Sequence, residues 1–322
     1  MAPRVTVCIV AYQSGPWLQP CVDALAAGSF TDFECVVADN ASTDGSVAAL
    51  RPPDARFRVE DMGANLGFAA ANNRVARASG AALFACLNPD AQPEPGWLAA
   101  LTAAADAHPG AAAFGSVQLR LEEPGVLDGL GDGWMLAGVA WRMGEGRPAR
   151  DLPGDGEIAA PCGAATLYRR DAFLELGGFE ERFFCYAEDV DLGLRLRRSG
   201  RPSRRASAAV VRHAGSAITG RRSDFTVYHG HRNRIWCWVR NTPGPWFWAL
   251  LPLHLLIDAY LLVELTRTGS GPAIRRAYRD AWRGLGPHWR ARRAAPAASF
   301  RALLSVSTLD PLASRRRAVT PR

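Results

Sequence analysis

Residues 35–46 read CVVADNASTDGS, a short apolar run that ends at Asp39 and gives way to a polar turn. The same pattern occurs at 5–10 and again at 82–87. Apolar runs of this length, closed by turn residues, predict buried parallel strands. Segments with helical character lie between and after them, at 17–26, 69–78 and 95–108. Strands alternating with helices over the first 110 residues predict a doubly wound α/β sheet.

Two acidic residues, Asp39 and Asp90, directly follow predicted strands. Ligands of doubly wound sheets bind beyond the carboxyl ends of the strands. Asp39 could accept hydrogen bonds from a nucleobase or ribose, or cap the next helix. Asp90 could ligate a divalent cation under substrate phosphates, or be an ordinary turn residue after Pro89. These residues alone leave both alternatives open. A helix is predicted over 44–50, with Asp44 as its N-cap.

The stretch 162–191 contains a small-residue loop, CGAA, and three acidic residues within four positions, Glu188, Asp189 and Asp191. Neighbouring carboxylates raise one another's pKa, and a raised pKa suits a proton acceptor. Acidic residues are also common at helix N-termini because of the macrodipole, but that preference accounts less well for three of them. Asp189 is therefore the candidate base. His213, at the end of a predicted strand, is a candidate metal ligand or a structural histidine.

Charge is distributed unevenly along the chain of 322 residues. All 38 basic residues are Arg, so no lysine is present to form a Schiff base or a Walker-type phosphate loop. Residues 266–322 hold thirteen Arg and two Asp, a net of +11; the first 265 residues therefore carry −4 of the overall +7. A basic tail beside an apolar segment favours an anionic membrane surface over nucleic acid, or is simply solvated.

Residues 246–265 are mostly apolar and about long enough to span a bilayer core of about 30 Å. They include His254, Asp258 and Glu264, and charges are costly in mid-membrane. A helix lying in the membrane interface, flanked by tryptophans, fits better than a span; packing within a soluble protein is the alternative. The seven cysteines lack CxxC spacing, which excludes common zinc and redox motifs and fits a reducing cytosol, and no signal peptide is expected.

Five motifs in order resemble glycosyltransferase family 2, in particular its bacterial rhamnosyltransferase-like branch. The motifs are DNASTDGS (39–46), NLGFAAANN (65–73), NPDA (88–91), GGFE (177–180) and YAEDVDLGLR (186–195). The resemblance covers about residues 5–216. It implies a GT-A fold, a Rossmann-like mixed sheet flanked by helices, with nucleotide-sugar and acceptor halves at 1–110 and 111–220. Residues 221–322 would form a helical, membrane-associating extension.

The resemblance also implies an inverting, metal-dependent transfer of one sugar from a nucleotide-sugar. Asp189 would be the general base, and Glu188 would support it. Mg²⁺ or Mn²⁺ would be held by Asp90, with His213 as a possible further ligand. The residues expected to line the nucleotide, donor sugar or acceptor are Tyr12, Asp39, Asn65, Gly67, Asn73, Gly163 and Asp191. Asn88-Pro89-Asp90 replaces the family's usual Asp-x-Asp, which removes one metal carboxylate.

By analogy, the donor is expected to be dTDP-L-rhamnose and the acceptor a lipid-linked or cell-envelope glycan, at the inner face of a bacterial membrane. Another UDP-, dTDP- or GDP-sugar is the alternative within the same fold. A sugar nucleotidyltransferase would require a glycine-rich basic loop after the first strand, where this chain has YQSGPW (12–17). A non-catalytic membrane- or nucleic-acid-binding protein would leave the acidic residues at 188–191 unexplained, and no nucleic-acid partner is expected.

Overall fold

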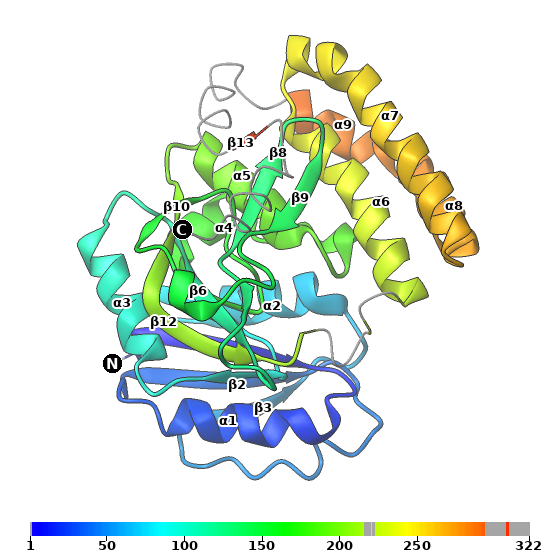
Figure 1. Cartoon of the computed structure of the whole chain (residues 1–322). Coiled ribbons are helices and arrows are strands. Elements are labelled where there is room, and N and C mark those ends of the chain that lie inside the picture. The colour runs from blue at the N-terminus through cyan, green and yellow to red at the C-terminus, as the bar shows by residue number, and fades with distance from the viewer. Residues whose placement is uncertain (1, 216–219, 221–222, 294–306, 309–322) are drawn as a thin grey trace.

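The structure, a computed structural model, describes residues 2–215, 220, 223–293 and 307–308. The strands of its large sheet are β1 (Val5–Ala11), β2 (Phe33–Asp39), β3 (Phe57–Asp61), β4 (Leu83–Leu87), β5 (Ala91–Pro93), β6 (Ala113–Arg120), β7 (Leu127–Gly129), β10 (Gly156–Ile158), β11 (Ala165–Arg169) and β12 (Ser203–His213). Its main order is β10-β12-β6-β11-β4-β1-β2-β3, while β5 pairs with β12 and β7 with β6 (Figure 1). A second sheet joins β8 (Asp132–Met135), β9 (Val139–Arg142) and β13 (Ser307–Thr308). The predicted mixed α/β sheet is confirmed.

Two helical layers cover the large sheet. The helices are α1 (Leu18–Ala26), α2 (Gly67–Ala78), α3 (Trp97–Ala107), α4 (Arg170–Glu175), α5 (Glu188–Arg198), α6 (Asp224–Asn241), α7 (Gly244–Arg267), α8 (Gly271–Arg283) and α9 (Leu285–Arg293). Successive side chains of a strand point to opposite faces, so Val7 packs with α1 and α3 while Cys8 packs with α2, α4 and α5. Both faces of β1 are thereby buried, which explains why its sequence is a continuous apolar run.

β1 pairs in parallel with both β2 and β4, and this register places the site. Ala11 lies opposite Asp39, so β1 and β2 end together. β12 runs parallel to β6 and ends at His213, which lies opposite Ala91 of β5. Asp90 directly precedes Ala91, and the backbone N–H of Ala214 donates to the carbonyl of Asp90 at 3.0 Å. Pairing of β5 with the end of β12 therefore brings together two candidate residues that lie 123 positions apart in the sequence.

The prediction of a helix over 44–50 is wrong, because this segment forms bends and turns. Asp44 accepts hydrogen bonds from the backbone N–H groups of Gly15 at 2.7 Å and Ser46 at 3.1 Å. Short acidic side chains that bind nearby backbone groups stabilise turns in competition with helices. The segment thus connects β2 to β3 as a loop that is tied to the turn after β1.

The helices of the C-terminal region, α6 to α9, pack beside α5, as Figure 1 shows. Their apolar cluster joins Val190 and Leu194 of α5 to Trp236 of α6 and Phe247 of α7. The predicted C-terminal helical extension is confirmed for residues 224–293, while 294–306 and 309–322 lie outside the described residues. Within the described residues, α7 is the one helix long and apolar enough to cross a membrane by length and composition.

Gly193 allows α5 to approach the chain before β11 closely. A Cβ atom at this position would lie 2.5 Å from the Cβ of Ala160 and 2.7 Å from the carbonyl oxygen of Ala159. Helix α5 therefore contacts backbone at a distance that any larger residue would prevent. This contact fixes the depth at which the acidic first turn of α5 sits.

Gly193→Ala should destabilise the protein by about 1–3 kcal/mol, because the added methyl overpacks a rigid contact. Gly230→Ala, in α6 with open space around it, should instead stabilise by about 0.5–1 kcal/mol through higher helix propensity. The free energy of unfolding in urea measures both changes. A gain in stability for Gly193→Ala would contradict the close contact.

Candidate functional site

The turns after β1 and β2 form one side of the site. Asp39 is half-buried and accepts a hydrogen bond from the N–H of Ser42 at 2.9 Å. Asn40, which the sequence analysis missed, donates to the side chain of Asn65 at 3.0 Å. Asn65 in turn accepts from the N–H of Gly67 at 3.0 Å. This chain of contacts joins the end of β2 to the N-terminus of α2. Tyr12, directly after β1, is 40% exposed.

Gly67 has a positive φ of 79°, and a Cβ there would lie 2.5 Å from the ring of Phe184. Glycine is required at this position by both the backbone conformation and the lack of space. Ala69 donates its N–H to the carbonyl of Phe184 at 3.2 Å. The first turn of α2 therefore packs against the segment that leads into α5, and two of the five sequence motifs meet there.

Asp90 and His213 face each other in the interior, 4% and 5% exposed. The Nε2 of His213 lies 3.3 Å from an oxygen of Asp90, and its Nδ1 lies 2.8 Å from an oxygen of Asp128. Burial lowers the pKa of His213, but the two carboxylates outweigh that effect and raise the pKa to about 9. Asp128 had not been singled out from the sequence.

Asp90 and His213 are the candidate ligands of a divalent cation. Among the described residues, no group of three or more His, Cys, Asp or Glu side chains has the arrangement of a metal site. The buried Nε2 of His213 nevertheless faces the carboxylate of Asp90 at 3.3 Å, while the other ring nitrogen is held by Asp128. A histidine oriented by a carboxylate is the usual form of a metal-binding histidine. The residues therefore fit an ion that takes its remaining ligands from substrate phosphates and water.

Asp189 lies in the first turn of α5, where its carboxylate accepts a hydrogen bond from the N–H of Gly163 at 2.8 Å. Gly163 also contacts the ring of Phe68, which leaves little room for a side chain. Burial raises the pKa of Asp189, against the opposing effects of the backbone donors and of Arg142. Its other oxygen accepts from the N–H of Val190 at 2.8 Å. A half-buried carboxylate with a raised pKa and a fixed orientation is suited to accept a proton.

Two further carboxyls lie near Asp189. Glu188 is 5% exposed, and one of its oxygens has no hydrogen-bond partner. Burial, followed by repulsion from Asp189, raises the pKa of Glu188 well above its usual value. Burial and the same charge raise the pKa of Asp132 to about 7. Asp132 comes from β8, and the sequence analysis did not identify it because no motif surrounds it.

Arg142, at the end of β9, connects the two halves of the site. One guanidinium nitrogen donates to Asp128 at 2.9 Å and the other to the sulfur of Cys162 at 2.7 Å. Asp128 holds His213, and Cys162 precedes the glycine that holds Asp189. A single cation is thus shared between the Asp90–His213 pair and the base. The only sequence signal for Arg142 was its place in the glycine-rich stretch 125–156.

Two predicted residues lie in structural networks instead. Asp191 is fully buried and binds Arg195, Arg240 and Asn241 at 2.8–3.0 Å. Although burial opposes it, the two arginines lower the pKa of Asp191 to about 2. Asn73 is 1% exposed, and its amide binds the backbone of Phe179 at 2.8 and 2.9 Å. Their side chains stabilise the fold, so we leave both out of the proposed site.

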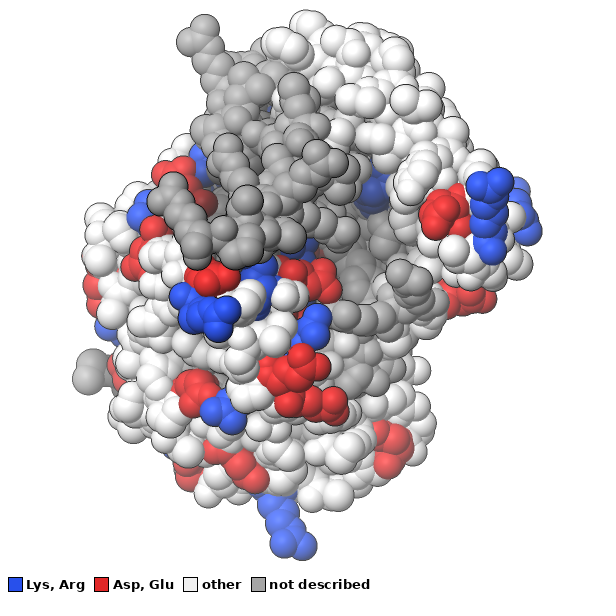
Figure 2. Space-filling model, in the orientation of Figure 1, with Lys and Arg blue, Asp and Glu red and all other residues white. Residues whose placement is uncertain are grey.

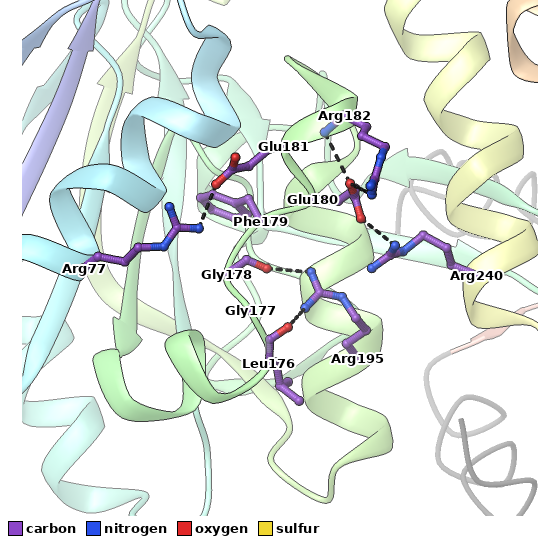
Figure 3. A pocket seen from close by; sticks show the side chains of 10 residues that line it. All are labelled: Arg77, Leu176, Gly177, Gly178, Phe179, Glu180, Glu181, Arg182, Arg195 and Arg240. Atoms are coloured by element: carbon purple, nitrogen blue, oxygen red, sulfur yellow. Dashed lines mark hydrogen bonds and ion pairs between the residues drawn. The ribbon is translucent and has the colours of Figure 1, made fainter. Parts of the chain in front are cut away.

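A charged cavity of about 430 Å³ lies beside these networks (Figure 3). None of the predicted site residues lines it. Its four arginines each bind an acidic side chain of the chain itself, as the ion pairs of Arg77 and Arg182 illustrate. With the cations paired, this cavity has no evident charge with which to hold a ligand, and the candidate site remains at the strand ends.

Comparison with known proteins agrees with this geometry. The family model for glycosyl transferase family 2 matches residues 6–177. An N-acetylglucosaminyl-diphospho-decaprenol L-rhamnosyltransferase of Mycobacterium tuberculosis is 33% identical over 296 residues, which cover 81% of this chain and 95% of the relative. The O-antigen biosynthesis protein RfbC of Myxococcus xanthus is 31% identical over 220 residues, 62% of this chain and 16% of that protein.

Solved structures share the fold. A Pyrobaculum calidifontis mannosyltransferase, determined with GDP-mannose and Mn²⁺, has a TM-score of 0.55 and 20% identity, covering 95% of this chain and 87% of its own. GalNAc-T7 with UDP, GalNAc and Mn²⁺ has a TM-score of 0.58 and 15% identity, covering 73% and 47%. With a family model that covers more than half of the chain and a relative aligned along nearly its whole length, this protein belongs to glycosyltransferase family 2, in its rhamnosyltransferase-like branch.

Proposed function

We propose that this glycosyltransferase moves L-rhamnose from dTDP-L-rhamnose to a hydroxyl of a polyprenyl-diphosphate-linked N-acetylglucosamine, with inversion. The observation that carries the proposal is Asp189, a carboxylate with a raised pKa fixed by the N–H of Gly163 at the strand ends. The mycobacterial relative supports this choice of donor sugar and acceptor. Transfer of another UDP-, dTDP- or GDP-linked sugar is the alternative.

The reaction follows from the placement of the side chains. Asp189 accepts the proton of the acceptor hydroxyl as that oxygen attacks the anomeric carbon. The bond from this carbon to the diphosphate breaks on the opposite face, so one displacement inverts the configuration. No nucleophile from the protein is needed. Burial and the nearby charge of Asp189 favour the neutral form of Glu188, which would leave the negative charge on Asp189.

The donor would lie along the turns after β1, β2, β3 and β4. Asp39 and Asn65 would bind the nucleoside, Gly67 would admit it close to the backbone, and Tyr12 would cover it. Asp90 and His213 would hold Mg²⁺ or Mn²⁺ beneath the diphosphate. When bound, the ion neutralises charge on the leaving group. Arg142 would fix the positions of His213 and Asp189 relative to each other through its hydrogen bonds to Asp128 and Cys162.

Asp189→Asn should lower kcat by about 10²–10⁴-fold, because general-base catalysis is lost. In the wild-type enzyme, burial raises the pKa of the base, so activity should fall with decreasing pH at values above an ordinary aspartate pKa of about 3.9. Rhamnosyl transfer measured from pH 4 to 9 tests both points. Asp106→Asn, at the opposite end of the strands, is the control. Turnover of Asp189→Asn at the control's rate would rule out this base.

Asp128→Asn should weaken Mn²⁺ binding in the presence of dTDP by about 10–100-fold, because the orienting carboxylate of His213 is lost. Since the pKa of His213 is about 9, ion binding at pH 7 should also release about one proton in the wild-type enzyme. Calorimetry in buffers of different ionisation enthalpy measures both. Equal dTDP affinity with Mn²⁺ and with a chelator would contradict the proposed ion site.

Helix α7 supports the further proposal that the protein binds an anionic membrane surface, at the inner face of a bacterial membrane. His254 is buried against Trp238, and the half-buried Asp258 pairs with Arg234, so these two polar side chains face the protein, while Glu264 near the end of the helix is exposed. The outer face is apolar at helical spacing: Trp246, Ala249, Leu253, Leu256, Tyr260 and Val263 are exposed. Figure 2 shows this white surface, with charged side chains near its end.

Exposed arginines also lie on the next two helices. Arg275, Arg276, Arg279, Arg283 and Arg290 are exposed on α8 and α9. Because the inner face of α7 packs against the protein, the helix would lie in the interface rather than span the bilayer. Apolar insertion beside basic residues is the combination that recognises anionic lipid. A lipid-linked acceptor would thereby be reached from the membrane surface.

The double variant Leu256→Glu/Tyr260→Glu should lose at least about ten-fold in binding to phosphatidylglycerol-containing vesicles, because two charges enter the apolar face. Val59→Glu, which charges an exposed apolar side chain on β3, should bind normally. Vesicle sedimentation at low and high salt measures this binding. Undiminished binding of the double variant would place the membrane contact elsewhere.

A further inference from the structure

The turn that leads into α5 has an unusual backbone. Phe184, Tyr186 and Ala187 have positive φ angles of 66°, 73° and 67°. Residues other than glycine disfavour this region, at a cost of order 1–3 kcal/mol each. Such a turn persists only when surrounding contacts hold it. The turn directly precedes Glu188 and Asp189, so its conformation determines where the carboxylate of Asp189 points.

Asn233 of α6 is the contact that holds this turn. Its side chain is fully buried, and its amide nitrogen donates to the carbonyls of Phe183 at 2.9 Å, Cys185 at 2.8 Å and Tyr186 at 2.7 Å. The amide oxygen accepts from the guanidinium of Arg232 at 2.9 Å, which fixes the orientation of the amide. Arg232 also donates to the carbonyl of Phe183 at 2.9 Å.

The C-terminal end of α6 binds the first turn of α5 at a second point, after Asp189. Arg240 and Asn241 donate to Asp191 at 3.0 and 2.8 Å. Arg240 also binds Glu180, which follows the GGF segment, at 2.6 Å (Figure 3). Asp189 therefore lies between two sets of contacts, one before it and one after it, both supplied by α6. Its own hydrogen bond to Gly163 depends on that placement.

We propose that Asn233 is a positioning residue for the transfer reaction: it holds the 183–187 turn so that Asp189 meets the N–H of Gly163 and the incoming hydroxyl. This proposal rests on the proposed function. Under this proposal, α6 positions the candidate base in addition to connecting the sheet domain to α7. Asn233 touches neither donor nor acceptor, so its effect acts through the orientation of the base.

Two variants test the proposal. Asn233→Ala removes the amide, and Asn233→Asp keeps its shape but replaces the donor with an oxygen that faces three carbonyls. Both should lower kcat by about 10–100-fold, because a small displacement of a reacting group has an effect of this size. The dissociation constant of dTDP-rhamnose, from calorimetry, should stay within about three-fold, because Gly67 is the one proposed donor residue that packs against the 183–187 turn, while Asp39 and Asn65 are held by other contacts.

The control is Ser79→Ala. It removes buried hydrogen bonds to Thr6 and Ala81 near the opposite end of β1, at a comparable expected cost in stability. A loss of kcat in Ser79→Ala equal to that in the Asn233 variants would show that stability alone is responsible, and would overturn the proposal. So would an Asn233→Asp enzyme with wild-type kcat, or a parallel loss of donor affinity.

Amide hydrogen exchange gives a readout that needs no substrate. In both Asn233 variants, the amides of residues 184–190 should exchange faster than in the wild-type protein and in Ser79→Ala, because the turn has lost its donor. If the wild-type enzyme does not transfer rhamnose, the proposed function fails while this measurement still tests the turn. Unchanged exchange would show that Asn233 does not hold it.

Discussion

Three carboxyls in four consecutive positions repel one another, and the site depends on how the fold separates their environments. Asp191 is buried with two arginines and an asparagine, and its pKa falls to about 2. Glu188 is buried without such partners, and its pKa rises. Asp189 lies between these extremes, half-buried and held by the backbone N–H groups of Gly163 and Val190. Similar side chains thus differ in role: Asp191 anchors the helix, burial favours the neutral form of Glu188, and Asp189 is the candidate base.

Arg142 affects the carboxyl groups in both halves of the site. This cation lowers the pKa of both Asp132 and Asp189, while it binds the carboxylate that holds His213. Burial without the arginine would favour neutral carboxyls, and a neutral carboxyl cannot accept a proton. The hairpin of β8 and β9 therefore supplies the cation that opposes the effect of burial on the candidate base.

The sequence predicted much of the first half of the fold because its strands are buried on both faces and appear as continuous apolar runs. It failed at 44–50, where Asp44 binds backbone groups in a turn instead of capping a helix. Asp189, Asp90 and His213 could be found because strand ends and acidic spacing are local signals. Asp128, Asp132 and Arg142 could not, because their importance comes from contacts with residues remote in the chain.

The sequence by itself determined the alternation of strands and helices, the apolar and basic character of the C-terminal region and the family. Each of these depends on residue type and order over short distances. Only the tertiary structure decided that Asp191 and Asn73 stabilise the fold, that His254 and Asp258 of α7 face inward, and that α6 reaches the turn before the candidate base. Burial and long-range hydrogen bonds set these roles, and neither can be read from spacing along the chain.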